Sequence, residues 1–250
     1  DRDPTGVRRY RLAVGEQLDA MGVIKRCGGG PDQFVPIINV AFANWLGQAQ
    51  LAGPGLLDAL AAACKDIGIA RVSRRDLPCA KDFPFDASIM SPSRWKPVFD
   101  ELSITADPQR WGEQFVRPLL RRCGEPYPYV ACLVADGDRM GETLDRMVSA
   151  DAHRKFSAAL AKVPGEARRI VEQDHLGSLV YAGGDDVLAF VPVPMALACA
   201  RALKDLFGSI MYHAFGGDIA APTLSVGIGV GHVMEGMGEL LELGREAERL

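Results

Sequence analysis

The sequence contains no C-x-x-C pair, although it has six cysteines: Cys27, Cys64, Cys79, Cys123, Cys132 and Cys199. Without that spacing, neither a zinc knuckle nor a redox motif is indicated, and reduced thiols of an intracellular protein are the simpler interpretation. No apolar run approaches the roughly 18 residues that suggest a membrane span, and the first residues show no signal-peptide pattern. We therefore expect a cytoplasmic protein with no membrane partner.

Two nucleotide-binding motifs are also missing. Gly-x-x-x-x-Gly-Lys-Ser/Thr does not occur, which argues against a P-loop NTPase. The glycines Gly227, Gly229 and Gly231 have the wrong spacing for a dinucleotide-binding loop and fall within a predicted strand. Both common ways of binding a nucleotide through a glycine-rich loop before a helix are thereby excluded.

Acidic and basic residues are unevenly distributed in a composition that is otherwise typical of a globular protein, with 48% hydrophobic and 24% charged residues in 250. Residues 1–125 hold 17 basic and 15 acidic residues, whereas residues 126–250 hold 11 and 17. A general nucleic-acid coat protein is excluded by this charge, although the N-terminal half suits contact with RNA or with neighbouring subunits. A phosphate ligand of the acidic half would need a metal ion as intermediary.

The N-terminal half has a helical pattern interrupted by loops. Apolar residues at helical spacing predict helices over residues 10–21, 40–50, 55–67 and 108–122. Three glycines at 28–30 predict a loop, and four prolines within residues 71–97 predict a long surface loop or an insertion. We expect a mainly helical region at 1–124 and a second domain at 125–250, with the boundary at Gly124 and Pro126.

The second half alternates strands and helices. The pattern predicts strands over 129–135, 178–182, 187–191 and 223–230, and helices over 143–147, 151–173, 194–215 and 235–250. The order β-α-β-β-α-β with a trailing helix predicts an α+β fold of the ferredoxin-like type.

Carboxylates stand at the ends of two strands that this fold places side by side. Asp136 closes the first strand, and Asp185 and Asp186 open the third. Because these strands are antiparallel neighbours, we expect at least two and up to four carboxylates at one edge of the sheet. Such a cluster would need a cation, and hard oxygen ligands select Mg²⁺ or Mn²⁺. Two such ions are the usual requirement for nucleotidyl transfer.

Two turns accompany the carboxylates. Gly183 and Gly184 predict a tight turn that lets a nucleotide approach the backbone. Arg139–Gly141 begin a turn into a short helix, whose free N–H groups suit a triphosphate. Either turn alone is more simply an ordinary loop, but their joint occurrence at strand ends favours a nucleotide site.

The residues at these turns also carry a family resemblance. The second half is similar to the palm domain of nucleotide polymerases, class III nucleotidyl cyclases and GGDEF-type diguanylate cyclases. The sequence motif VADGDRMG at 134–141, followed by YAGGDDVL at 181–188, most resembles the Cmr-type large subunit of type III CRISPR effector complexes. Diguanylate cyclases usually have Phe after the acidic pair, whereas Val187 stands here. SVGIG at 225–229 resembles the last palm strand of that family, and residues 15–26 resemble the segment ahead of the palm.

The resemblance implies an enzyme that joins ATP molecules into cyclic oligoadenylate second messengers after its complex captures target RNA. Its partners would be the other Cmr-type subunits, crRNA and target RNA. The resemblance gives Asp136, Asp185 and Asp186 the role of metal ligands, assisted by the backbone of Gly137. The phosphate-binding and nucleotide-binding residues it implies are Asp138, Arg139, Met140, Gly141, Gly183 and Gly184.

Departures from the family leave alternatives open. The family often has an HD nuclease domain and a zinc-binding cysteine cluster, but this chain has neither a His-Asp dipeptide nor a C-x-x-C pair. DNA cleavage and zinc are therefore not predicted for it. The chain begins without Met and ends within a helical pattern, so we expect a piece of a larger subunit. The alternatives are a GGDEF-like or class III cyclase that makes another cyclic nucleotide, and a nucleotide-binding scaffold without turnover.

Overall fold

The computed structural model describes residue 20 and residues 35–69, 71–74, 76–215 and 221–250. Apart from Ala20, the helix predicted over residues 10–21 lies outside the described residues, as does the glycine loop at 28–30. Residues 35–250 form one compact unit, which is described here by itself. None of the described helices is both long and apolar enough to cross a membrane.

The segment before the sheet is helical, as predicted. Its elements are α3 (Ile37–Ala52), α4 (Pro54–Asp66), α5 (Pro78–Lys81), η1 (Ala87–Met90), η2 (Pro92–Arg94), α6 (Trp95–Glu101), α7 (Pro108–Phe115) and α8 (Arg117–Cys123). The single helix predicted over residues 108–122 is in fact two, because Pro118, in the first turn of α8, has no N–H to continue the hydrogen bonds of α7.

The prediction of a surface loop over residues 71–97 is wrong. Phe83, Phe85 and Trp95 from this segment are buried. The side-chain amide of Asn39 on α3 donates to the carbonyl of Phe85 and accepts from the amide of Ala87, at 2.8 and 3.1 Å. The buried Asn39 thus supplies hydrogen bonds to the backbone between α5 and η1. Two of the prolines, Pro78 and Pro92, begin short helices, and the prolines gave no information on burial.

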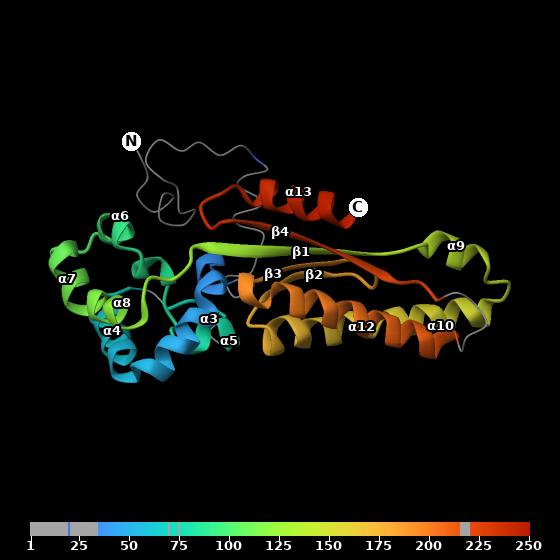
Figure 1. Cartoon of the computed structure of the whole chain (residues 1–250), viewed down its shortest axis with the longest axis horizontal. Coiled ribbons are helices and arrows are strands. Elements are labelled where there is room, and N and C mark those ends of the chain that lie inside the picture. Colours follow the sequence, from blue (N-terminus) through green and yellow to red (C-terminus); the bar gives the residue numbers. More distant parts are fainter. Residues whose placement is uncertain (1–19, 21–34, 70, 75, 216–220) are drawn as a thin grey trace. The chain divides into compact units, whose positions relative to one another are not determined.

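The sheet has four antiparallel strands in the order β2-β3-β1-β4 (Figure 1). The strands are β1 (Tyr129–Gly137), β2 (Ser178–Ala182), β3 (Val187–Pro192) and β4 (Leu224–His232). This order, with helices between the first and second and between the third and fourth strands, confirms the ferredoxin-like α+β prediction.

The helices of this half are α9 (Met140–Asp145), α10 (Ala150–Leu160), α11 (Val163–Arg168), the π-helical η3 (Arg169–Asp174), η4 (Val193–Met195), α12 (Ala196–Phe215) and α13 (Met237–Glu248). The single helix predicted over residues 151–173 is interrupted between α10 and α11, and Pro164 stands in the first turn of the second piece. The apolar spacing continued across that interruption, so periodicity alone did not reveal it.

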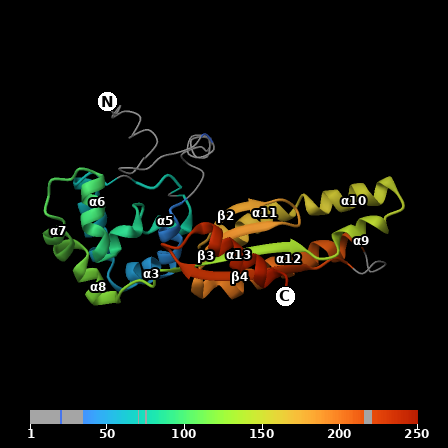
Figure 2. The ribbon, with the colours of Figure 1, turned by 90° about the horizontal axis from the view of Figure 1, so that it is seen from above.

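The two faces of the sheet are covered by different helices. Ala131, Leu133 and Ala135 of β1 belong to a core shared with α10, α11 and α12. Val130 and Cys132 point to the other face, into a core shared with α3 and α13. Figures 1 and 2 show α13 over one face of the sheet and α12 along the other. Alternate residues of β1 therefore define two faces, and Asp136 continues the α13 face.

Helix α13 lies unusually close to the sheet because glycines face it. A Cβ on Gly229 would stand 2.7 Å from the carbonyl oxygen of Leu240 and 2.8 Å from the amide of Gly244. A Cβ on Gly227 would collide with the same helix backbone. Gly227 and Gly229 therefore have a packing role, since they let a helix backbone approach the strand directly.

One hydrophobic core contains residues from both sides of the predicted boundary. Val130 and Phe190 of the sheet pack in the same core as Phe42 and Trp95 of the helical region. Helix α3 contacts both β1 and β3. The division into domains at residues 1–124 and 125–250 stays a prediction, and within the described residues the two parts share their interior.

Candidate active site

The site centres on two carboxylates at the ends of adjacent strands. Asp136 lies near the end of β1, and Asp186 immediately precedes β3, one step beyond the register pair Ala135 and Val187. Both side chains are exposed. Partial loss of hydration, a hydrogen bond with Asp136 and the charges of Asp185 and Asp136 together raise the pKa of Asp186 above the ordinary aspartate value. Two neighbouring carboxyl groups that repel each other in this way form a candidate site for a cation.

Asp185 lies beside Gly137 and Met140. A Cβ on Gly137 would lie 2.8 Å from the Cβ of Asp185 and 2.8 Å from Cγ of Met140. A side chain at residue 137 would therefore displace Asp185 or Met140. Asp185 is close enough to Asp186 for its charge to raise the pKa of Asp186, but the direct carboxyl contact is between Asp136 and Asp186. The predicted trio thus consists of one pair in contact and one neighbouring charge.

The glycine turn has the tight geometry that the sequence predicted. The amide of Gly183 donates to the carbonyl of Asp186 at 2.9 Å, which closes the turn between β2 and β3. Gly184 has φ +87°, a conformation that side chains with a Cβ rarely adopt. This turn fixes where Asp185 and Asp186 leave the sheet.

Asp138 does not join the carboxylate pair. Its two side-chain oxygens accept hydrogen bonds from the hydroxyls of Thr223 and Ser225, at 2.5 and 2.7 Å. Its amide donates to the carbonyl of Thr223 at 2.8 Å. The sequence pattern allowed for up to four clustered carboxylates, and that upper number is wrong. Asp138 instead binds two hydroxyl donors at the start of β4. Those donors lie 85 and 87 residues away in sequence, so no local pattern could reveal them.

The turn after β1 is held in an uncommon conformation. Arg139 has φ +56°, a left-handed backbone that is rare outside glycine and is often found at functional sites. Thr143 donates both its amide and its hydroxyl to the carbonyl of Arg139, each at 3.0 Å. Met140 and Gly141 then begin α9, which has only six residues. The predicted contact of this turn with phosphates stays a prediction.

The donor set fits a divalent cation of the hard type. Asp136 and Asp186 supply neighbouring carboxylate oxygens, and a bound cation would offset the repulsion between their charges. Over the described residues, no group of three or more His, Cys, Asp or Glu side chains is assembled for a metal ion. That search includes five of the six cysteines, which are free. Cys27 lies outside the described residues.

Tyr181 is a site residue that the sequence did not single out. It is the register partner of Leu188, so it lies on the α13 face, with Asp186 two residues before Leu188 on the same face. Its side chain is 54% exposed, and its hydroxyl occupies the space where a Cβ on Gly183 would stand. Its exposed aromatic ring, close to the carboxylates, offers a flat apolar surface to a planar ligand. The register shift between Leu179 and Tyr181 brings it to this face, and such a shift has no sequence signal.

Comparison with known proteins identifies the second half of the chain. The family described as Cas10/Cmr2, second palm domain, matches residues 129–250. A relative from Pyrococcus furiosus, the CRISPR system Cmr subunit Cmr2, is 31% identical over 157 residues, covering 53% of this chain. The chain spans 18% of the length of that relative.

Solved structures are similar at lower sequence identity. A cryo-EM structure of a type III-B Cmr-beta complex in the apo state is 13% identical, with a TM-score of 0.46, over 92% of this chain and 33% of that one. The GGDEF domain of TpbB from Pseudomonas aeruginosa is 20% identical, with a TM-score of 0.35, over 56% of this chain and 81% of that one.

Proposed function

Residues 129–250 belong to the second palm domain family of Cas10/Cmr2, and on that premise we propose that the chain is a metal-dependent nucleotidyltransferase that converts ATP to cyclic oligoadenylates. The proposed reaction is attack of a ribose 3′-hydroxyl on the α-phosphorus of a second ATP, with pyrophosphate as leaving group. Such a reaction requires positioning and charge neutralisation above all.

The observation that carries this proposal is the contact between Asp136 and Asp186. Each carboxylate stands at the end of one of two adjacent strands, exposed to solvent, where it could bind the same cation. The ion, Mg²⁺ or Mn²⁺, would activate the hydroxyl and neutralise charge on the phosphates. In this proposal Asp185 is the third carboxylate of the site, and the backbone of Gly137 assists it.

The other residues of the site have positioning roles in the proposal. The turn at Gly183 and Gly184 leaves backbone without side chains beside the carboxylates, so a nucleotide can approach closely. Arg139 is exposed at the strained turn before α9 and offers a cation to the triphosphate. Asp138 holds that turn to the start of β4 through Thr223 and Ser225, so its role is to orient the neighbouring residues.

The partners follow from the family. We propose that the chain acts within a Cmr-type effector complex with the other subunits and crRNA, and that capture of target RNA starts the reaction. The chain spans less than a fifth of its Pyrococcus relative, so activity is to be measured on the complete subunit in its complex.

Incubation of the assembled complex and target RNA with each nucleoside triphosphate in turn tests the proposal. We expect oligoadenylates from ATP with Mg²⁺ or Mn²⁺, and little product from GTP, CTP or UTP. Cyclic dimers from GTP would support a GGDEF-like enzyme instead. Binding of ATP without any product would support the scaffold alternative.

A further inference from the structure

Three aromatic side chains among the described residues are exposed to solvent, those of Tyr127, Tyr181 and Tyr212. Tyr127 precedes the first residue of β1, whereas Asp136 lies near the last. Tyr212 lies on α12, which packs on the opposite face of the sheet. Tyr181 lies on the same face as Asp186, immediately before the turn that leads to it. Of the three, Tyr181 is therefore the aromatic residue beside the carboxylate pair.

The ring of Tyr181 lies against the glycine turn between β2 and β3. A Cβ on Gly183 would collide with the hydroxyl of Tyr181 and with the ring atoms next to it. The side chain of Tyr181 therefore extends along β2 towards the turn, and it can do so because residue 183 has no side chain. Gly183 thus makes room for a ring that is already in place before any ligand arrives, which lowers the entropy cost of binding to it.

Tyr181, Asp186 and Asp136 follow one another across the sheet. They come from β2, β3 and β1, which are consecutive neighbours in the strand order. Because neighbouring strands lie about 4.8 Å apart, the carboxylate pair begins about one strand spacing from the tyrosine and ends about two away. A nucleotide whose base lies on the ring can therefore place its α-phosphate over the carboxylates.

The surface next to the ring is apolar and uncharged. Leu188 is the register partner of Tyr181 on one side and of Val134 on the other, and both aliphatic side chains are partly exposed. Helix α13 packs on β4 and β1, and in Figure 2 the β2 strand lies beside this helix. The tyrosine ring and Leu188 thus offer a flat apolar surface on which a purine can lie.

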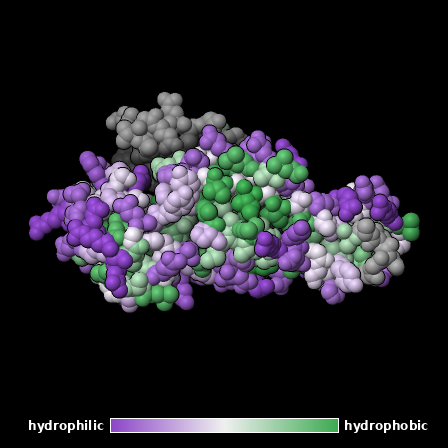
Figure 3. All heavy atoms as spheres, in the orientation of Figure 1, coloured by the Kyte–Doolittle hydropathy of each residue, from purple (hydrophilic) through white to green (hydrophobic). Residues whose placement is uncertain are grey.

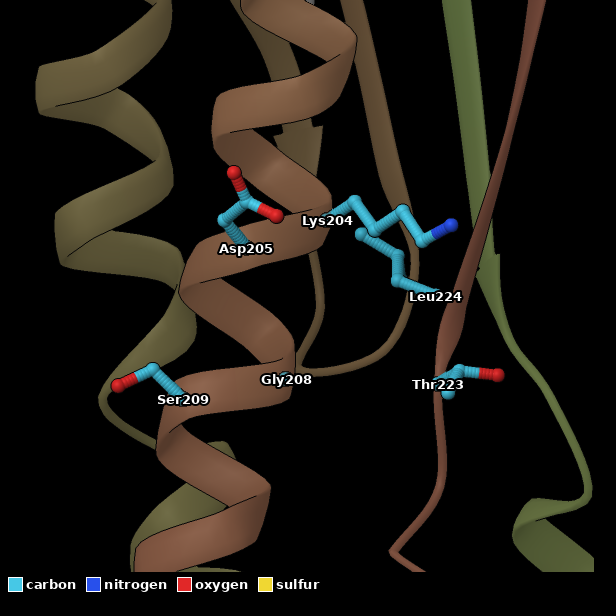
Figure 4. A pocket seen from close by; sticks show the side chains of 6 residues that line it. All are labelled: Lys204, Asp205, Gly208, Ser209, Thr223 and Leu224. Atoms are coloured by element: carbon cyan, nitrogen blue, oxygen red, sulfur yellow. The ribbon is translucent and has the colours of Figure 1, made fainter.

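Two other surfaces of this half of the chain lack that arrangement. Figure 3 shows apolar side chains gathered over β4 and the neighbouring helices, at the edge of the sheet opposite β2. Figure 4 shows a cavity of about 310 Å³ between α12 and β4, whose lining includes Lys204 and Asp205 and no aromatic side chain. That cavity lies on the α12 face, whereas Asp136 and Asp186 lie on the α13 face. Neither surface places a flat ring beside the carboxylates.

We propose that Tyr181 stacks on the adenine of the ATP whose α-phosphate is bound at the Asp136–Asp186 pair. The inference rests on the proposed function, because that function supplies the ATP, and it adds the residue that holds the base. Stacking uses the face of the base and none of its hydrogen-bonding groups. Tyr181 therefore contributes affinity for a purine without selecting adenine over guanine, and its hydroxyl is dispensable.

Binding of 3′-deoxy-ATP with Mg²⁺ to the complete subunit in its complex, followed by calorimetry, tests the inference without turnover, because this nucleotide has no 3′-hydroxyl. Tyr181→Leu should weaken binding at least about fivefold, since the stacking contact with the base is lost. Tyr181→Phe keeps the ring and should bind within about twofold of the parent. Inorganic tripolyphosphate has no base, so it should bind equally to the parent and to Tyr181→Leu.

Tyr212→Leu is the matched control, because it removes an exposed tyrosine from α12 on the other face of the sheet. It should leave the affinity for 3′-deoxy-ATP within about twofold of the parent. Equal weakening by Tyr181→Leu and Tyr212→Leu would overturn the inference. An equal loss of tripolyphosphate and 3′-deoxy-ATP binding in Tyr181→Leu would also overturn it, because a lost base contact cannot affect a ligand without a base.

Product formation separates this inference from the proposed function. If the complex makes oligoadenylates but Tyr181→Leu binds 3′-deoxy-ATP as the parent does, the inference is wrong and the proposed function stands. If binding of 3′-deoxy-ATP depends on the ring but the complex makes no oligoadenylate, the base contact stands and the proposed function is contradicted. A parent complex that does not bind 3′-deoxy-ATP would overturn the inference, whatever product it makes from ATP.

Discussion

Asp186 and Asp136 occupy adjacent positions at one end of the β1–β3 strand pair, where partial burial and then the neighbouring Asp136 carboxyl raise the pKa of Asp186. Two like-charged groups at this distance destabilise each other unless a proton or a cation lies between them. This arrangement predicts effects on stability, metal binding and catalysis.

The Asp136–Asp186 pair should lower the stability of the metal-free protein and raise the stability of the protein with a bound cation. In EDTA, Asp186→Asn should raise the melting temperature slightly, because it removes the repulsion. Added Mn²⁺ should stabilise the parent but not the variant, with affinity for the ion reduced by at least about tenfold. Thermal melts with and without Mn²⁺ measure both effects. Mn²⁺ stabilisation of the variant equal to or larger than that of the parent would contradict the assignment.

The same contact predicts a pH dependence. The raised pKa of Asp186 means that its neutral form is favoured in the folded state. Its contribution to stability is therefore fully present below the unfolded aspartate pKa, about 3.9, and is lost as pH rises through the folded value. Relative to Asp186→Asn, the parent should lose unfolding free energy over this range in EDTA. Urea unfolding at a series of pH values measures the difference, and a rise with pH would have the wrong sign.

The close packing of α13 on the glycines of β4 predicts a steric effect. Gly229→Ala should reduce the unfolding free energy by about 1–3 kcal/mol, because its Cβ would push against helix backbone, which cannot rotate away. Gly238→Ala on α13 is the matched control, since its Cβ would meet no atom within 4 Å. The control should leave stability unchanged or raise it by up to about 1 kcal/mol. Equal effects of the two substitutions in urea unfolding would rule out the packing role.

A buried ion pair links the helical region to the palm. Glu172 on η3 is 2% exposed, and its carboxylate lies 2.7 Å from Arg168 and 3.7 Å from Arg74. Glu172→Ala should cost about 1.5–3 kcal/mol, because it removes the buried acceptor of a charge-assisted hydrogen bond from Arg168, while both arginines stay in partial contact with solvent. Glu166→Ala, which removes the exposed partner of Arg169, should cost less than about 1 kcal/mol. Similar costs for the two variants in urea unfolding would contradict this role for Glu172.

The sequence predicted the parts of the fold that depend on local signals. The four strands have short apolar runs bounded by glycine or aspartate, and their order specifies the ferredoxin-like sheet. It also placed Asp136 and Asp186 together, because the antiparallel pairing of β1 and β3 follows from that topology. Burial of residues 71–97 was missed, since it depends on Asn39 and the helices packed against that segment. The partners of Asp138 and the position of Tyr181 depend on strand register, which sequence patterns do not determine.

The central claim is that Asp136 and Asp186 carry nucleotidyl transfer, and mass spectrometry of products from isotope-labelled ATP tests it most directly. The complete subunit, in its complex with target RNA and Mn²⁺, should yield cyclic oligoadenylates. Asp136→Asn/Asp186→Asn should reduce the yield at least about 100-fold. The matched double variant Asp58→Asn/Asp66→Asn, exposed on α4, should retain full yield. Product from the Asp136→Asn/Asp186→Asn complex equal to that of the parent would contradict the account.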